Sequence, residues 1–108
     1  EVPEKLIDAV GAVSGSSPAF VFMFMEALAD GGVKAGMPRS QAYRFAAQAV
    51  LGSAKLMKES GKHPGELKDM VCSPGGTTIE GVQVLEEMGL KGAVMAAVSK
   101  CVEKSGKM

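Results

Sequence analysis

Several residue types on which nucleic-acid and metal sites depend are nearly absent from this sequence. It contains no tryptophan, one tyrosine and one histidine, and its twelve basic residues are balanced by twelve acidic ones. Few aromatic rings and no basic excess argue against nucleic acid or an anionic membrane, since both attract clustered positive charge. One histidine and two distant cysteines do not form a metal motif. We therefore expect no metal site and neither nucleic acid nor membrane as a partner.

Long uninterrupted apolar runs are also missing. Residues 9–25 carry no charge, but glycines, a proline and three serines interrupt them. The continuous apolar part, residues 19–25, is far shorter than the roughly 20 residues of a membrane span. The first residues, 1–4, do not read as a signal peptide. Cys72 and Cys101 allow a disulfide, but a reduced thiol pair is the simpler interpretation. Together these features predict a cytoplasmic protein.

What the sequence does contain is the pattern of one all-α domain covering residues 1–108. Its length suits a single domain, and apolar residues recur at helical spacing without a useful period-two alternation. We predict helices at about 3–13, from 18 to the glycines at 31–36, then at 41–59, 64–71, 78–88 and 90–104. Candidate caps and stops are Ser16 or Ser17, Ser40, Gly61, His63 and Gly89.

The second predicted helix begins with residues 18–25, which are apolar on every side. A surface helix of a small monomer has a polar face, so part of this helix is expected to contact another subunit. Glu26 and Asp30 lie four residues apart on one face further along; they either form a site or simply reach solvent or a lysine. The third helix presents a narrow face of small residues that includes Ala42 and Ala46, which favours close helix packing.

The stretch from Ser73 to Thr78 reads Ser-Pro-Gly-Gly-Thr-Thr and interrupts the helical pattern. Thr77 or Thr78 is a candidate N-cap, and Glu80 in the first turn suits the positive end of a helix. A glycine-rich loop that opens a helix can hold a small anion on free N–H groups. The alternative is a plain loop with a capped helix, since most such caps bind nothing.

Several separate segments of the chain resemble one family, the pyrroline-5-carboxylate reductases. The likeness runs in register from about residue 1 to residue 102. Its motifs are residues 14–19 (SGSSPA), 26–34 (EALADGGVK), 36–38 (GMP), 63–69 (HPGELKD) and 71–78 (VCSPGGTT). The resemblance implies an intertwined homodimer, with possible assembly into decamers, built by a helical C-terminal domain. It also implies an N-terminal Rossmann domain for NADPH or NADH, whose G-x-G-x-x-G fingerprint is not in this chain.

The resemblance further implies an activity and a set of site residues. Members of this family reduce 1-pyrroline-5-carboxylate to L-proline, the last step of proline biosynthesis. In the family, backbone N–H groups of the loop that corresponds to Gly75, Gly76, Thr77 and Thr78 hold the substrate carboxylate. The threonine matching Thr78 hydrogen-bonds the ring nitrogen, which makes it the expected catalytic residue, and a glutamate matching Glu4 lies near the substrate.

The chemistry of this loop agrees with that expectation on its own terms. A cyclic imine needs its carboxylate anchored and its nitrogen supplied with a hydrogen-bond partner, and N–H groups with a hydroxyl can do both. Without the cofactor domain, the 108-residue chain alone is expected to be inactive. Two alternatives remain: a free-standing helical interaction module without catalysis, or another dehydrogenase with a similar helical domain, against which the loop sequence argues.

Overall fold

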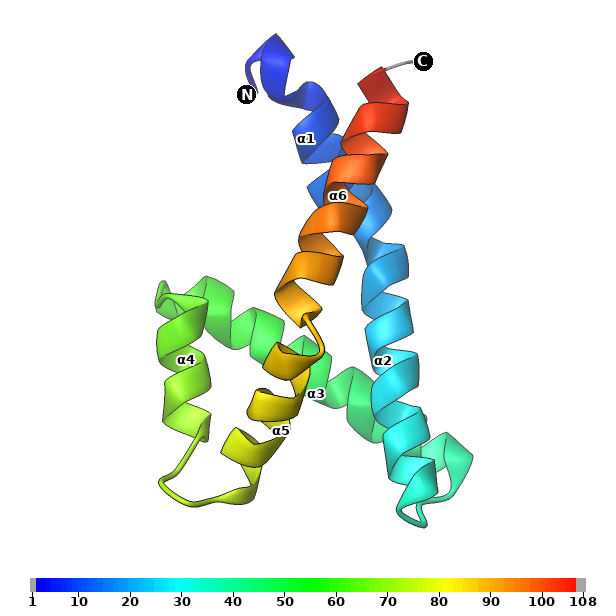
Figure 1. The fold of residues 1–108 in the computed structure, drawn as a ribbon, viewed down its shortest axis with the longest axis vertical. Helices are drawn as coiled ribbons and strands as arrows, with labels where there is room; N and C mark the ends of the chain where they lie inside the picture. Colours follow the sequence, from blue (N-terminus) through cyan, green and yellow to red (C-terminus); the bar gives the residue numbers. More distant parts are fainter. Residues whose placement is uncertain (1, 107–108) are drawn as a thin grey trace. The chain divides into compact units, whose positions relative to one another are not determined.

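The computed structural model describes residues 2–106, and all of its regular structure in that range is helical (Figure 1). The predicted all-α fold class is therefore confirmed. The elements in chain order are the 3₁₀ turn η1 (Glu4–Leu6), α1 (Ile7–Gly11), the π-helical turn η2 (Ala12–Ser16), α2 (Ser17–Lys34), α3 (Arg39–Ser60), α4 (Pro64–Val71), α5 (Thr77–Glu87) and α6 (Leu90–Gly106). These elements form two compact units, of which unit 1 holds residues up to 21 and from 81 onward, and unit 2 holds residues 22–80.

The expected break between the first two helices does not occur. Helical structure runs without interruption from Glu4 to Lys34, so the prediction that Ser16 or Ser17 begins a new helix is wrong. Ser14 and Ser17 instead donate their hydroxyls back to the carbonyls four residues earlier, those of Val10 and Val13.

A single π-helical turn explains how the helix passes Pro18. The N–H of Ser17 donates to the carbonyl of Ala12, five residues back, and the helix then continues in α geometry. A proline inside a regular α-helix lacks one N–H and crowds the carbonyl four residues before it. The wider turn just before Pro18 relieves that crowding, because it shifts the hydrogen-bond register by one residue.

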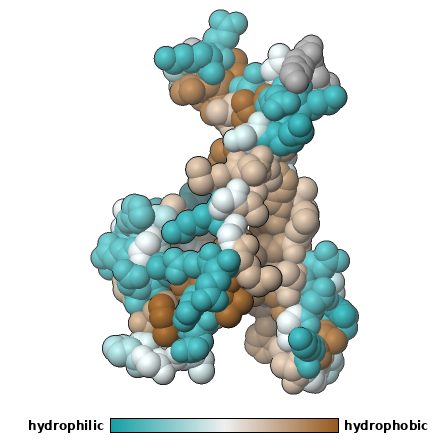
Figure 2. Space-filling model, in the orientation of Figure 1, coloured by the Kyte–Doolittle hydropathy of each residue, from teal (hydrophilic) through white to brown (hydrophobic). Residues whose placement is uncertain are grey.

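The continuous run has a second consequence. Its most apolar 18-residue stretch has a mean hydropathy of 1.4, so its length and composition are sufficient for a membrane span. The argument that glycine, proline and serine interrupt the run is therefore wrong. Only 6% of that stretch is buried within one copy of the chain, and Figure 2 shows apolar residues over most of α2. An apolar helix with so little cover needs another apolar surface beside it.

In unit 2, α2 and α3 approach each other through small residues. Ala29, Ala42 and Ala46 are buried, and a Cβ added at Gly32 would lie 3.5 Å from the Cβ of Ala42. The small-residue face predicted for the third helix is thus confirmed at Ala42 and Ala46, whereas Ala49 and Ala54 of the same predicted face are exposed. Beside this contact, Arg39 pairs with Asp30 and lies over the ring of Tyr43, 5.8 Å from its centroid.

The ends of the helices follow local chemistry more closely than their beginnings do. Gly61 ends α3 with φ of 70°, and Gly89 follows α5 with φ of 79°, as both stops were predicted. Ser40 does not cap α3, which begins one residue earlier at Arg39 and has Pro38 in the cap position. Pro38 makes no side-chain hydrogen bond to the helix. Its fixed φ sets the backbone direction at the start of α3 in place of a side-chain cap.

In unit 1, α6 packs against α1 and the π-helical turn η2 (Figure 1). Ala12 is buried in this contact. The predicted apolar set of the last helix is only partly covered, because Ala97, Val98, Cys101 and Val102 are half-buried while Met95 is exposed. Cys72 and Cys101 are both free, as the reduced-thiol interpretation expects.

The surface of a single copy is unusually large for its mass. The chain exposes 8463 Å², whereas a compact monomer of 11.1 kDa would expose roughly 5,700 Å². Even two separate compact bodies of half that size would total only about 6,800 Å² by the same scaling. The excess is apolar, since the exposed residues include Phe22, Met23 and Phe45, each about two-thirds accessible.

The alanine contact of unit 2 can be tested by enlarging one side chain. We predict that Ala42→Leu lowers the free energy of unfolding by about 1–3 kcal/mol, since a larger side chain forces α2 and α3 apart. Ala47→Leu is the matched control, because Ala47 lies exposed in the same helix and leucine is nearly as good a helix former. Urea denaturation at one protein concentration compares the two; equal losses would contradict the close contact.

Candidate functional site

The loop between α4 and α5 is a tight hydrogen-bonded turn. The N–H of Gly76 donates to the carbonyl of Ser73 at 3.0 Å, which closes a four-residue turn with Pro74 and Gly75 at its centre. Gly75 has φ of 68°. Proline followed by a residue with positive φ defines a type II turn, and any side chain at Gly75 would be strained there.

Gly76 closes the turn without room for a side chain. A Cβ at this position would lie 2.5 Å from Ser73 Oγ and 3.3 Å from the Ser73 carbonyl oxygen. Because α5 starts at the next residue, Gly76 occupies its N-cap position. Each of the two glycines therefore has its own physical requirement, one conformational and one steric, and the chain enters α5 directly from the turn.

Thr77 and Thr78 are the first two residues of α5, so the prediction that one of them is the N-cap is wrong. Both side chains are exposed, and neither hydroxyl has a hydrogen-bond partner within residues 2–106. The first backbone N–H groups of a helix also lack intrahelical acceptors. The start of α5 thus presents free N–H donors beside two free hydroxyls, an arrangement suited to a small anion with an adjacent acceptor or donor atom.

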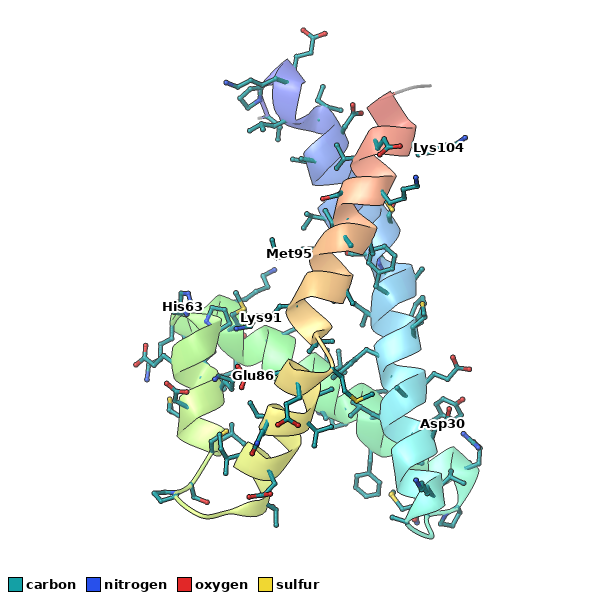
Figure 3. The ribbon with its side chains drawn as sticks, viewed as in Figure 1. Asp30, His63, Glu86, Lys91, Met95 and Lys104 are labelled. Atoms are coloured by element: carbon teal, nitrogen blue, oxygen red, sulfur yellow. The ribbon has the colours of Figure 1, made fainter. Side chains whose placement is uncertain are left out.

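The single histidine does not belong to this loop. His63 Nδ1 accepts a hydrogen bond from the N–H of Gly65 at 2.9 Å, so it caps α4 as predicted. Figure 3 shows His63 at the beginning of α4, whereas the loop follows the other end of that helix. The start of α5 therefore offers its N–H groups and hydroxyls without this imidazole.

Glu4 belongs to unit 1, whereas the loop belongs to unit 2. It is the first residue of η1 and is exposed, and it borders an open hollow together with Val2, Pro3 and Ile7. Its carboxylate has no hydrogen-bond or ionic partner within the described range. Of the predicted site residues, Gly75, Gly76, Thr77 and Thr78 are thus contiguous around one turn, and Glu4 belongs to a separate element.

A second hollow, in unit 2, was not predicted. It has a volume of about 330 Å³ and is lined by Phe22, Met23, Met25, Glu26 and Tyr43. Glu26 is exposed at this hollow, whereas Asp30 forms the ion pair with Arg39; the hydrogen bond to Asp30 raises the pKa of Arg39. The pair Glu26 and Asp30 therefore does not act as one site, since the two carboxylates have different surroundings. The four-residue spacing of Glu26 and Asp30 in the sequence did not indicate that their surroundings differ.

The chain is similar to proteins of one kind. Residues 4–108 match the family described as pyrroline-5-carboxylate reductase dimerisation. The chain is 65% identical over 107 residues to a pyrroline-5-carboxylate reductase of Escherichia coli, with 99% of this chain and 40% of the relative covered. It is 54% identical over 103 residues to pyrroline-5-carboxylate reductase 2 of Bos taurus, with 94% and 32% covered. The chain thus spans about two fifths or less of these relatives.

Solved structures agree with the sequence comparison. A 1-pyrroline-5-carboxylate reductase of Streptococcus pyogenes superposes with a TM-score of 0.96 at 42% identity, covering 100% of this chain and 42% of that one. A Plasmodium falciparum pyrroline carboxylate reductase with NADP bound superposes with a TM-score of 0.92 at 41% identity, covering 97% of this chain and 40% of the other.

Proposed function

Because this chain belongs to the pyrroline-5-carboxylate reductase dimerisation family, we propose that it is the helical, dimer-building part of such a reductase and carries its substrate loop. The observation that supports the substrate role is the start of α5, where free N–H groups and the hydroxyls of Thr77 and Thr78 follow a tight glycine turn. The whole protein would reduce 1-pyrroline-5-carboxylate to L-proline in proline biosynthesis.

The residues of this chain do not fit a dinucleotide. Residues 2–106 contain no strand, and the G-x-G-x-x-G turn that binds a pyrophosphate follows a strand. We infer that NADPH or NADH is bound mainly outside this chain. The cofactor would supply the hydride to the C=N carbon of the substrate. What remains for the described helices is to bind and orient the imine.

Each loop residue then has a role in orienting the substrate. The backbone around Gly75, Gly76 and Thr77 holds the substrate carboxylate, because the start of a helix favours negative charge. The N–H of Gly76 already donates to the Ser73 carbonyl, so the neighbouring N–H groups make this contact. The hydroxyl of Thr78 hydrogen-bonds the ring nitrogen as the imine becomes an amine. Glu4, from η1, supplies a carboxylate near the substrate. The loop positions and polarises its ligand through backbone N–H groups and hydroxyls.

The proposed homodimer follows from the unburied apolar surface. An obligate interface buries about 2,000 Å² or more in total, roughly half of it on each copy. Each copy exposes more than that half beyond what its mass requires. Phe22 and Phe24 of α2 are exposed in one copy, at 66% and 41%. A second copy of α2 and α3 would cover such rings, and further assembly into a decamer is compatible with the family.

The alternative is a helical interaction module without catalysis. The large apolar surface would serve such a module equally well. The exposed hydroxyls of Thr77 and Thr78 are compatible with it as well, since water can hydrogen-bond them. Activity of the longer protein separates the two.

We predict that the 108-residue chain forms a folded homodimer at micromolar concentration. Phe22→Glu should abolish the folded dimer and leave unfolded or aggregated protein, because a carboxylate cannot be buried there without a partner. Gln48→Glu, at an exposed polar position of α3, is the control for added charge. Sedimentation with circular dichroism measures both properties; a folded monomer of the unmodified chain would contradict the dimer.

The same 108-residue chain is predicted to be inactive by itself. It should not oxidise NADPH in the presence of 1-pyrroline-5-carboxylate, whereas a longer reductase that contains it should do so. Absorbance at the nicotinamide band follows both reactions directly. Turnover by the isolated chain would show that its own helices bind the cofactor.

Thr78 provides the direct test of the loop in the longer reductase. Thr78→Ala should lower kcat/KM roughly ten- to a hundredfold, since it removes a hydrogen bond to an atom that changes charge. Thr78→Ser should retain much more activity because it keeps the hydroxyl. Steady-state kinetics and a melting curve are measured for both variants.

The melting curve distinguishes this role from helix capping. In the described structure the Thr78 hydroxyl makes no hydrogen bond, so Thr78→Ala should leave the melting temperature nearly unchanged. Ser99→Ala, which removes an exposed hydroxyl from α6, controls for hydroxyl loss in a helix. Wild-type kcat/KM together with a lowered melting temperature would assign Thr78 to the helix end and remove it from the active site.

A further inference from the structure

The first and last helices of unit 1 are joined by a side-chain hydrogen bond. Ser105 Oγ donates to Asp8 Oδ1 at 2.9 Å, across 97 positions of sequence. Asp8 lies in the first turn of α1 and is half-buried, and Ser105 lies near the end of α6. The bond therefore fixes the beginning of the long N-terminal helical run against the end of the chain's last helix.

The surroundings of Asp8 make this hydroxyl important. The last turn of a helix carries partial negative charge, which repels a carboxylate brought to it. Lys104 is the basic residue of that turn, but Figure 3 shows it extending to the side away from α1. The other carboxylate oxygen, Oδ2, would lie 3.5 Å from a Cβ placed on Gly106. Asp8 thus lies close against the end of α6, where the hydroxyl of Ser105 donates to its carboxylate.

Glu4 precedes Asp8 by four residues, which is one helical turn. The carboxylate of Glu4 has no partner within the described residues. η1 is the three-residue 3₁₀ turn that begins the run, and its own backbone hydrogen bonds run from Leu6 N–H to the Pro3 carbonyl and from Ile7 N–H to the Glu4 carbonyl. Terminal turns of helices fray unless a tertiary contact holds them. One turn further along, the hydrogen bond between Asp8 and Ser105 ties this part of the run to another element, α6.

We propose that Ser105 is a positioning residue: through Asp8, it holds the turn that presents Glu4 to the substrate. This inference rests on the proposed function, specifically on the role of Glu4 near the bound imine. Ser105 itself makes no contact with the loop residues or the substrate in this proposal. Its effect should therefore appear as weaker substrate binding, with the rate of the chemical step little affected.

The test uses a full-length reductase that contains this chain. Ser105→Ala should raise KM for 1-pyrroline-5-carboxylate about five- to tenfold, within the range of one typical net hydrogen bond, with kcat within about twofold. Ser105→Thr keeps the hydroxyl and should restore KM. Ser99→Ala is the matched control, because Ser99 lies in α6 with an exposed hydroxyl and no partner among the described residues.

A second pair of variants tests the route through Glu4. In a Glu4→Gln background, Ser105→Ala should raise KM no further, because the group that it positions is already gone. Equal increases in both backgrounds, or a KM equal to that of Ser99→Ala, would overturn the proposal while the reductase remains active. An unmodified protein without any reduction of 1-pyrroline-5-carboxylate would instead overturn the proposed function, and this inference with it.

Discussion

Within residues 2–106, the apolar side chains that are buried where helices meet are alanines, and the rest of the structure depends on that constraint. The four buried hydrophobic residues of the described range are all alanines: Ala12, Ala29, Ala42 and Ala46. Alanine brings two helix backbones close but removes little apolar area from water, at roughly 25 cal/mol per Å². Contacts of this kind fix where helices meet without stabilising a fold by themselves. The large side chains face outward, and they need a surface that one copy does not contain.

The fold class and most helix ends could be predicted from sequence because they depend on local chemistry. Gly61, Gly89 and His63 act within one turn of their own position, so their roles can be read without knowing the fold. The failure at Ser14 to Ser17 has a different origin. Serine, glycine and proline in succession usually end a helix, but a one-residue shift in hydrogen-bond register absorbs the proline and lets the helix continue. No sequence pattern indicates that shift. The prediction therefore also missed its consequence, which is a continuous apolar helix long enough to span a membrane.

The candidate site divides in the same way. Pro74 and Gly75 identify a turn, and threonines after two glycines identify a helix start, so four of the site residues could be located from the sequence. The first residue of α5 could not be predicted from the sequence. Gly76 and Thr77 are both acceptable N-cap residues, and they are one residue apart, which is within the usual uncertainty of a helix boundary. Glu4 was found only through the family resemblance, since an exposed carboxylate in a first turn is common on any helical protein. The hydrogen bond between Asp8 and Ser105 spans nearly the whole chain and leaves no local trace.

The outward-facing apolar residues also change how this sequence can vary. In a homodimer related by a two-fold axis, each residue at the interface occurs twice and often faces the same patch of the other copy. A substitution that weakens packing by a small amount therefore weakens it at two places in one assembly. Both losses weaken the same equilibrium, the association of two copies into a dimer. A substitution at a buried alanine within one copy instead affects the folding of each subunit separately. Such a surface should tolerate fewer substitutions of small individual effect than its exposure in a single chain suggests. The exposed phenylalanines of α2 would be among its most restricted positions.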